Sequence, residues 1–453
     1  MRASLYTADW VLPVTAPPIP GGAVLVDERG LIRAVGRRAE IEGGGGAATL
    51  DLGAAILLPG LVNVHTHPEL TAMRGLLEDL PFHQWIPALR RAKEGARLDD
   101  GDFAAAARWC CLESIAAGIT TVGATEDSGA ALDALREAGL RGIVFREVFG
   151  PAPARARSAL QELSRSVGEM RRAATDLVRV GVSPHAPYTV SDELFRLVAA
   201  YATAEALPVA VHAAESEVET QLVREGAGPF AAGLRTRGIE TVPRARSTIA
   251  LLDETGILDT RPLLIHCVRV DADDVVRIAD AGAAVAHCPV ANARLGHGIA
   301  PVIELLEAGI TVGIGSDSVA SNNRIDLLEE ARIAQLMQRA RLSSAGALGA
   351  DRLLRLITLD GARALGLDSR VGSLETGKEA DLCAVRIDAP HTHPVTDPVA
   401  TLLFSARGAD VVLTMVHGRI LYRDGVFHSL DPARVRDRVA SVAARMRAAR
   451  DTD

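Results

Sequence analysis

Short apolar runs alternate with amphipathic stretches along most of this chain. Each run is short enough for one buried strand, and in each following stretch apolar residues recur three and four positions apart, as on one face of a helix. The predicted strands are residues 56–64, 120–124, 142–148, 178–182, 208–211, 263–265, 283–286 and 311–314. The predicted helices include residues 103–117, 132–138, 154–174, 192–206, 273–281 and 300–308. Eight strand–helix units in succession predict a closed parallel (β/α)8 barrel, or TIM barrel.

Both ends of the chain have a different, β-rich pattern. An Asp-Glu-Arg-Gly turn between residues 21–26 and 31–35 predicts a hairpin, and the glycine run at 43–47 predicts a loop. The C-terminal pattern predicts strands at 377–387, 411–416 and 419–422 and an Arg-rich exposed helix at 432–450. We therefore expect an α/β protein in which both termini build a small β-sandwich beside the barrel. The expected boundaries are 1–57 and 369–453 for the sandwich and 58–368 for the barrel.

Composition narrows the class of partner. The formal net charge is −8, which does not favour nucleic acid or an anionic membrane and favours a small molecule. The five cysteines form no CxxC pair, which indicates a reducing compartment. The N-terminal sequence lacks the pattern of a secretory signal, and no apolar run is long enough to span a bilayer, so the expected location is the cytoplasm.

The first barrel strand ends in a His-x-His motif. His65 and His67 are two positions apart, and on a strand such residues project to the same face. Both rings should therefore point into the mouth at the C-terminal end of the barrel, where active sites of this architecture lie. Two converging imidazoles form half of a site for Zn²⁺ or Fe²⁺. The motif alone is also compatible with two polar residues at a strand end.

Three later strands end in the same way. His212, His266 and Asp317 each follow an apolar run in successive units of the predicted barrel. A lone histidine in such a place is usually a core residue, but four strand ends carrying ligand-type side chains predict a metal site. Binuclear hydrolases of this architecture usually bridge their metals with a barrel lysine. The fourth strand has none, so we expect one divalent ion, with Zn²⁺ preferred and Fe²⁺ as the alternative.

The same residues suggest a hydrolytic reaction. A divalent metal lowers the pKa of the water it holds to about 7. Asp317 is placed to ligate or border the metal and to accept the water proton, and His266 could polarise the water or complete the ligand set. Glu215 follows His212 closely and could protonate a ring nitrogen of the substrate. The alternative for Glu215 is a solvated loop carboxylate, because Glu217 and Glu219 stand beside it.

At this point the chain resembles a known family. The segments that carry the resemblance are PGLVNVHTH (59–67), HAAE (212–215), HC (266–267), GSDSVASN (315–322) and VGSLETGKEADL (371–382). They are similar to the amidohydrolase superfamily, within its deaminase and chlorohydrolase branch, over nearly the whole chain. The resemblance implies that the metal ligands are His65, His67, His212 and Asp317. It also implies that Glu215 and His266 handle protons, with Asp317 as the third catalytic residue.

Within this branch, two groups of deaminases are similar. Deaminases of 5′-methylthioadenosine and S-adenosylhomocysteine share SPHAPYT (183–189), whose histidine lies against the substrate nucleoside, so His185 is a candidate substrate contact. They also carry a Trp followed nine residues later by a Glu that holds ribose hydroxyls, and Trp85 and Glu94 stand at that spacing as candidate substrate-binding residues. The aminodeoxyfutalosine deaminases share residues 67–75, 145–150, 228–230 and 287–298. The resemblance therefore implies hydrolytic deamination of an adenosine-like metabolite. The first expected substrate is 6-amino-6-deoxyfutalosine of menaquinone synthesis, and the alternative is 5′-methylthioadenosine or S-adenosylhomocysteine.

Several single residues have two readings. Arg146 at a strand end could bind a substrate carboxylate in a bidentate manner, or it could form an ion pair with Glu147 or with a neighbouring helix. His83 could belong to a lid over the mouth. Either His287 or His297 could touch substrate, although a structural hydrogen bond is the expected role of both. Cys267 and Cys288 are expected to be buried packing residues, and His391 and His393 to lie in an exposed loop.

Two other function classes stay open. The same site could hydrolyse a halide or an alkylamine from a triazine ring. The barrel could also be a non-catalytic scaffold, although every expected ligand is present. The related enzymes imply a homodimer or a larger homo-oligomer.

Overall fold

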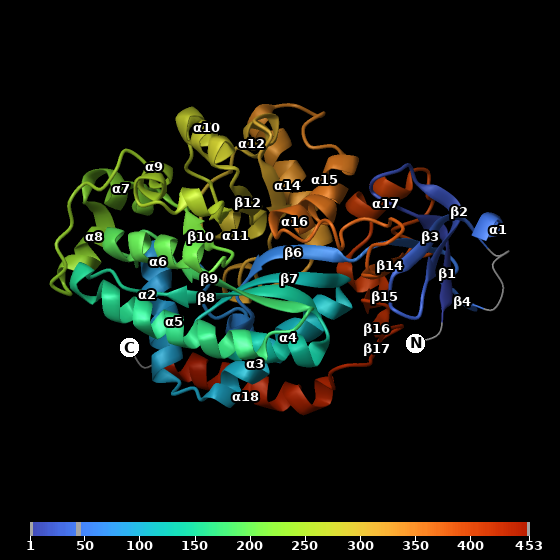
Figure 1. Ribbon diagram of the computed structural model, residues 1–453, viewed down its shortest axis with the longest axis horizontal. Coiled ribbons are helices and arrows are strands. Elements are labelled where there is room, and N and C mark those ends of the chain that lie inside the picture. Colours follow the sequence, from blue (N-terminus) through green and yellow to red (C-terminus); the bar gives the residue numbers. More distant parts are fainter. Residues whose placement is uncertain (1–2, 42–46, 451–453) are drawn as a thin grey trace.

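The barrel strands form two parallel four-stranded sheets, with the orders β6-β7-β8-β9 and β10-β11-β12-β13. A computed structural model describes residues 3–41 and 47–450 (Figure 1). The eight strands are β6 (Leu61–Thr66), β7 (Ile119–Glu126), β8 (Arg141–Val148), β9 (Val178–Pro184), β10 (Ala210–Ala213), β11 (Leu263–His266), β12 (Ala284–His287) and β13 (Thr311–Ile314). Their order along the chain is their order in space, as a barrel of this type requires.

Specific contacts join the two sheets at both seams. A parallel bridge between Val182 and Val209 connects the β9 side to the start of β10. At the other seam, the Asn63 side-chain amide donates to Ser316 Oγ at 2.8 Å, and the Ser316 backbone N–H donates to Asn63 Oδ1 at 3.0 Å. The Asp317 N–H donates to the His65 carbonyl at 3.0 Å, so this seam also fixes two predicted site residues next to each other.

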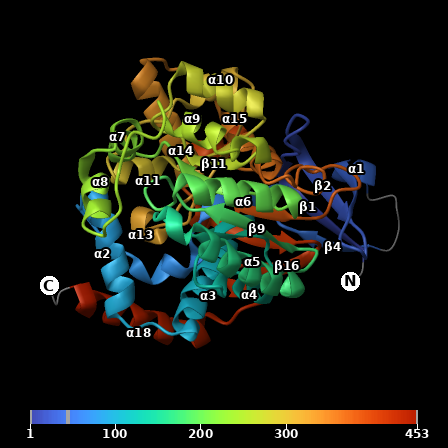
Figure 2. The ribbon, with the colours of Figure 1, turned by 60° about the vertical axis from the view of Figure 1, so that its left-hand side comes forward.

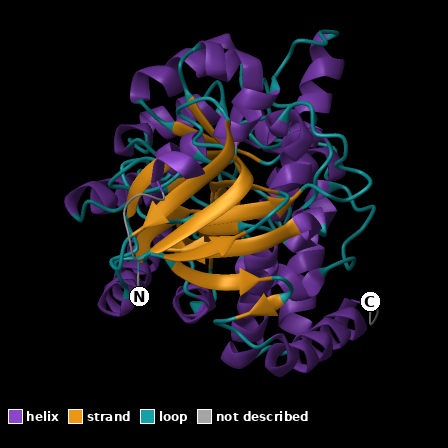
Figure 3. Ribbon diagram, turned by 90° about the vertical axis from the view of Figure 1, so that its right-hand side faces the viewer, coloured by secondary structure: helices purple, strands orange, loops and turns teal. Residues whose placement is uncertain are grey.

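Helices surround the barrel strands. Figure 3 shows helices around a middle occupied by strands, with the strands of the terminal segments nearest the viewer. Ser191 and Asp271 cap two of these helices through side-chain oxygens that accept backbone N–H groups. The helices of four residues or more in this region are α2 (Phe82–Gly95), α3 (Asp100–Ala116), α4 (Ala130–Ala138), α5 (Ala156–Ala173), α6 (Asp192–Ala204), α7 (Glu217–Glu225), α8 (Gly228–Arg235), α9 (Thr248–Glu254), α10 (Ala272–Ala281), α11 (Pro289–Arg294), α12 (Val302–Glu307), α13 (Val319–Asn322), α14 (Leu327–Leu342), α15 (Ala350–Leu356) and α16 (Leu359–Ala364).

The segments from both ends of the chain share one nine-stranded sheet. Its order is β17-β16-β15-β14-β5-β1-β2-β3, and β4 pairs with β1. The strands are β1 (Ser4–Val11), β2 (Ile19–Val26), β3 (Ile32–Arg37), β4 (Ala48–Asp51), β5 (Ala55–Pro59), β14 (Leu382–Arg386), β15 (Val411–Val416), β16 (Arg419–Arg423) and β17 (Val426–Phe427). The helices α1 (Arg38–Ile41) and α17 (Pro398–Phe404) lie in the same two segments. A two-layer sandwich and the predicted domain boundaries remain predictions, and most of the loop predicted at 43–47 lies outside the described residues.

The first predicted strand, residues 56–64, is in fact two strands. β5 belongs to the terminal sheet and β6 to the barrel, and Gly60 separates them. A Cβ atom at Gly60 would lie 2.1 Å from Thr120 Oγ1, so only glycine fits where the chain passes from one sheet to the other. The prediction of one continuous strand was wrong because an apolar run does not reveal which sheet each half joins.

The C-terminal helix α18 (Pro432–Arg450) is less exposed than its arginine content suggested. It lies along α3 and α2, as both views show (Figures 1 and 2). Val442 and Met446 are buried against this layer, and Arg438 and Arg445 pair with Asp102 at the start of α3. The prediction of an exposed helix was therefore wrong for one of its faces. Within the described residues, no helix has the length and apolar character needed to cross a membrane.

Candidate active site

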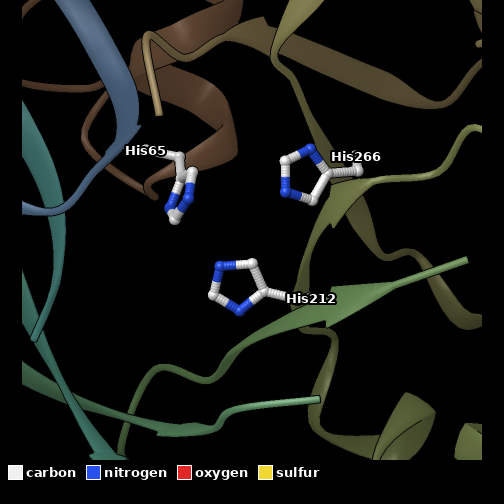
Figure 4. A group of neighbouring side chains, drawn as sticks. All are labelled: His65, His212 and His266. Atoms are coloured by element: carbon white, nitrogen blue, oxygen red, sulfur yellow. The ribbon is translucent and has the colours of Figure 1, made fainter. Parts of the chain in front are cut away.

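The predicted ligand-type side chains meet at one end of the barrel. His65 lies in β6, His212 in β10 and His266 at the end of β11, and Figure 4 shows their three rings facing a common space. The ring centroids of His65 and His212 are 5.0 Å apart, and those of His212 and His266 are 5.6 Å apart. His67 follows β6 directly, and its ring centroid lies 4.9 Å from that of His65. The convergence predicted from the strand ends is present.

Asp317 completes this cluster from the last strand. Its Oδ1 lies 3.3 Å from His65 Nε2 and 3.7 Å from His67 Nε2, while its Oδ2 accepts a hydrogen bond from Ser321 Oγ at 2.7 Å. Three overlapping sets of possible metal ligands follow, each with donor atoms within 4.8 Å of one another. The sets are His65–His212–His266, His65–His67–Asp317 and His67–Glu147–His212.

The hydrogen bonds prepare the histidines to bind a cation. His212 Nδ1 is 3.0 Å from the His185 carbonyl, and His266 Nδ1 is 2.9 Å from Asn292 Oδ1. Because these oxygens only accept, both Nδ1 atoms carry hydrogen and both Nε2 atoms keep a lone pair. Burial lowers the pKa values of His67, His212 and His266, which favours the neutral rings that metals bind. The buried Nε2 of His65 has no aligned hydrogen bond within the described chain, so the donor set fits a divalent metal.

The backbone around the cluster is strained. Ala214, His266 and Asp317 have φ angles of 52°, 78° and 54°, a left-handed region that residues other than glycine rarely adopt. Such strain gathers at functional sites because the surrounding structure has to impose it. Gly315 lets the backbone approach closely before Asp317, since a Cβ atom there would lie 2.9 Å from the Cβ of His65.

Glu215 lies beside the cluster on the β10–β11 side. Its Oε1 is 3.5 Å from His266 Nε2 and 3.2 Å from His297 Nε2, and the Tyr188 hydroxyl donates to its Oε2 at 3.3 Å. Burial raises the pKa of this carboxyl to about 7, and the nearby charge of Asp317 acts in the same direction. A carboxyl with such a pKa is suited to proton transfer near neutral pH. The reading of Glu215 as a solvated loop carboxylate was wrong, because the side chain is buried.

Glu219 is a site residue that the sequence did not reveal. Its Oε1 accepts from the Ala214 N–H at 2.8 Å and from Thr248 Oγ1 at 2.6 Å, and its Oε2 accepts from the Glu215 N–H at 3.0 Å. These bonds fix the loop that carries Glu215. The available signal was the spacing Ser216-x-x-Glu219 at the start of a helix, which predicts that Glu219 turns back toward the preceding backbone.

A second carboxyl lies on the opposite flank, at the end of β8. Phe145 belongs to the barrel interior, and side chains alternate along a strand, so Glu147 also points inward. Its Oε1 lies 3.9 Å from His185 Nε2, and the His185 ring centroid is 4.7 Å from that of His212. The structure thus places the predicted contact His185 beside the cluster. From the sequence, Glu147 was expected only as a possible ion-pair partner of Arg146. The alternation of side chains along β8 already predicts that Glu147 points inward.

Arg146 points to the other side of the strand. It is the register partner of Glu126 in β7, and its Nη1 lies 3.7 Å from Glu126 Oε1. Glu126 Oε2 in turn accepts the N–H groups of Gly129 and Ala130 at the start of α4. This arrangement supports the ion-pair alternative for Arg146, with Glu126 as the partner instead of Glu147.

Trp85 and Glu94 do not lie together. Both belong to α2, and nine residues of an α-helix turn through two and a half turns, so the two side chains leave opposite faces. Glu94 is 68% exposed and lies near Arg90, whereas Trp85 is buried. The two side chains therefore do not face one common site in this structure, and a contact of either with substrate stays a prediction.

Trp85 instead belongs to an aromatic wall beside Glu215. The wall consists of Phe82, Trp85, Tyr188 and Phe230. Phe82 has ring-centroid distances of 6.3 Å to Trp85, 5.9 Å to Tyr188 and 5.8 Å to Phe230, and Tyr188 stacks on Phe230 at 4.4 Å. His297 meets the edge of this wall, 4.6 Å from Phe82. The rings of this wall belong to one hydrophobic cluster, which places apolar side chains next to the Glu215 carboxyl.

The other residues with two readings fall outside the centre. Cys267 and Cys288 are buried and unpaired, as expected of packing residues. His391 lies 2.8 Å from Asp410 Oδ2 in the terminal sheet region, and His393 is exposed. His83 is half-buried in α2, so its role in a lid stays a prediction. The barrel strand β9 carries no lysine, and Lys93 bonds to Asp127.

A family model and named relatives both match most of this chain. A model of the amidohydrolase family matches residues 56–421. A 5-methylthioadenosine/S-adenosylhomocysteine deaminase of Moorella thermoacetica is 34% identical over 440 residues, which cover 96% of this chain and 97% of that protein. A 5′-deoxyadenosine deaminase of Methanothermobacter thermautotrophicus is 34% identical over 397 residues, which cover 86% and 87%.

Solved structures share the fold over almost the whole chain. An adenosine deaminase from Xanthomonas campestris, solved with bound zinc, superposes with a TM-score of 0.87 at 28% identity and 99% coverage of both chains. The Helicobacter pylori aminofutalosine deaminase superposes with a TM-score of 0.80 at 22% identity, covering 92% of this chain and 99% of that one. At that identity the second likeness supports the fold alone.

Proposed function

This chain belongs to the amidohydrolase family, and we propose that it removes the 6-amino group of an adenosine-like nucleoside by hydrolysis. It is a hydrolase that acts on C–N bonds. The observation that carries the proposal is the buried carboxyl of Glu215, whose pKa burial raises to about 7, beside a cluster of five ligand-type side chains. Hydrolysis of an aminopurine requires both an activated water and a proton for the ring.

The metal ligands in this proposal are His65, His67, His212 and Asp317, holding one divalent ion, with Zn²⁺ preferred. A bound divalent ion would lower the pKa of a water molecule to about 7, so that the water could lose a proton and act as a nucleophile at neutral pH. The zinc in the Xanthomonas campestris structure supports this choice. The lone pair on His212 Nε2 and the Asp317 oxygen that faces His65 are the features of this chain that fit the ion.

The other residues handle protons and hold the base. Asp317 would accept a proton from the attacking water, and Glu215 would donate a proton to N1 of the ring. His266 would hold the water in line through its Nε2, because its Nδ1 is fixed by Asn292. The aromatic wall and His185 would contact the two ends of the nucleoside, and water would be excluded because this region is buried.

The leading substrates are 5′-methylthioadenosine, S-adenosylhomocysteine and 5′-deoxyadenosine. Relatives of 34% identity that carry these names support them. The aminodeoxyfutalosine assignment stays a prediction, because the aminofutalosine deaminase supports only the fold. The cytoplasmic location and the oligomeric state also stay predictions.

One assay tests the proposal and its alternatives. Purified protein with measured metal content is incubated with each leading substrate, with 6-amino-6-deoxyfutalosine and with an aminotriazine or chlorotriazine. Loss of adenine absorbance together with released ammonia is expected for at least one nucleoside. Turnover of triazines without any adenine nucleoside would overturn the proposal, and a protein that never takes up metal would point to a scaffold.

A further inference from the structure

Glu147 has no structural task that the described residues reveal. Its side chain is 4% exposed, and its Oε1 has no hydrogen-bond partner among them. The same carboxyl has an oxygen within 4.8 Å of a ring nitrogen on both His67 and His212. An unpaired polar atom at such depth is costly unless a water, an ion or a ligand satisfies it, and this one faces the histidine cluster.

Two basic side chains near Glu147 pair with other carboxyls. Lys93 Nζ donates to both oxygens of Asp127, at 2.9 and 3.1 Å. Arg146 lies on the opposite side of the strand, where its Nη1 approaches Glu126 Oε1 to 3.7 Å without a hydrogen bond. Neither cation forms an ion pair with Glu147 among the described residues. Glu147 differs in this respect from Glu219, whose two oxygens accept three hydrogen bonds.

The position of Glu147 decides which part of a substrate it can meet. Glu215 occupies the β10–β11 flank of the histidine cluster, and Glu147 occupies the β8–β9 flank. The carbon under attack has to lie over the cluster, with ring nitrogen N1 toward Glu215. The leaving amine is the exocyclic substituent of C6, next to N1. The sugar is attached to the five-membered ring of the purine, farther from C6. A carboxyl within 4.8 Å of ring nitrogens on His67 and His212, on the flank away from Glu215, lies beside this carbon on the side from which the amine can depart.

We propose that Glu147 hydrogen-bonds the departing amine, as a second substrate-contacting carboxyl. This inference rests on the proposed deamination. In that reaction a C–O bond forms between water and C6, and the C6–N bond breaks with its electron pair leaving on nitrogen. Of the two water protons, one ends on N1 and the other on the amine, which departs as ammonia. Glu147 orients that nitrogen for proton uptake and departure.

A change of leaving group tests the contact. The substitution Glu147→Leu removes the polar atoms, and Glu147→Gln keeps the shape and some hydrogen bonding. Both variants are assayed with the best adenine nucleoside and with 6-chloropurine riboside, whose chloride leaves without a proton. The ratio of the two kcat/KM values is expected to fall by about tenfold to a hundredfold in Glu147→Leu and by less in Glu147→Gln, because only the amine loses a hydrogen bond. Metal content should equal that of the wild type.

Each other outcome contradicts the inference. An unchanged ratio would make Glu147 a spectator or a structural residue, and loss of metal would make it a ligand. If Glu147→Leu does not fold, the ratio in Glu147→Gln decides, and no change there overturns the proposal. The wild-type protein separates the two levels: failure to deaminate any adenine nucleoside refutes the proposed function, whereas deamination with an insensitive ratio refutes only the role of Glu147.

Discussion

Replacing Glu219 with glutamine tests how the general acid is positioned. The wild-type carboxylate accepts three hydrogen bonds, from the backbone N–H groups of Ala214 and Glu215 and from the Thr248 hydroxyl. A glutamine keeps one acceptor oxygen and presents an NH₂ group in place of the other. If the remaining oxygen stays with Ala214 and Thr248, the NH₂ group faces the Glu215 N–H, and the loop that carries the acid loses its anchor.

The magnitude follows from burial. Glu219 is fully buried, so an unsatisfied N–H group there costs about 1–3 kcal/mol. For 453 residues, an unfolding entropy of about 2.1 cal/mol/K per residue amounts to about 1 kcal/mol/K, so the melting temperature should fall by only about 1–3 °C. General acid catalysis contributes about 10²–10⁴ in rate, and a displaced Glu215 forfeits part of it. We expect kcat to fall about 10- to 100-fold, with KM within about threefold.

Glu217→Gln is the matched control. Glu217 stands two residues earlier, at the start of the same helix α7, is 59% exposed, and lies 3.9 Å from Arg269 at the surface. Its substitution should leave kcat within about twofold, because exposed ion pairs contribute little. Steady-state kinetics, metal analysis and thermal melting of both variants give the result. A wild-type kcat in Glu219→Gln, or the same kcat loss in both variants, would refute the positioning role.

Three further outcomes are expected. Removal of metal by a chelator should abolish activity, Zn²⁺ should restore it, and Asp317→Asn should bind the ion more weakly; activity that survives complete metal removal would contradict the proposed site. The value of kcat/KM should fall about tenfold per pH unit above about pH 7, because Glu215, whose pKa burial raises to about 7, then has no proton to donate; a profile that is flat across neutrality would argue against Glu215 as the acid. Arg141→Met should lower the free energy of unfolding by about 3–5 kcal/mol, because it leaves the buried Asp381 carboxylate without its arginine partner. The control Arg165→Ala, at an exposed ion pair, should change the free energy of unfolding by less than about 0.5 kcal/mol. Equal melting temperatures for the two variants would refute this prediction.

The strand ends could be predicted because two simple regularities coincide there. In a parallel barrel all strands end at the same face. Ligand-type residues that directly follow the apolar strands must therefore lie close together at that face. His65, His212, His266 and Asp317 follow this rule. The protonated Nδ1 atoms and the neutral rings could not be predicted, because they depend on partners such as Asn292 that are far from the histidines in sequence.

Side-chain direction was the weaker part of the prediction. A spacing of nine residues paired Trp85 with Glu94, but on one helix this spacing separates them by half a turn. At the end of β8, the prediction named Arg146 as the candidate substrate contact because a guanidinium can bind a carboxylate. The alternation of side chains along the strand instead turns Glu147 inward. In both cases local geometry decided what the residue types left open.

The paired strands β5 and β14 have a consequence for the topology of the whole chain. Pro59, the last residue of β5, is the register partner of Leu382, the first residue of β14. The chain therefore leaves the terminal sheet at β5, forms the barrel, and re-enters the same sheet at the neighbouring strand β14. A cut in a surface loop of the barrel would leave this hydrogen-bonded junction itself unbroken, because both of its strands lie outside the barrel segment.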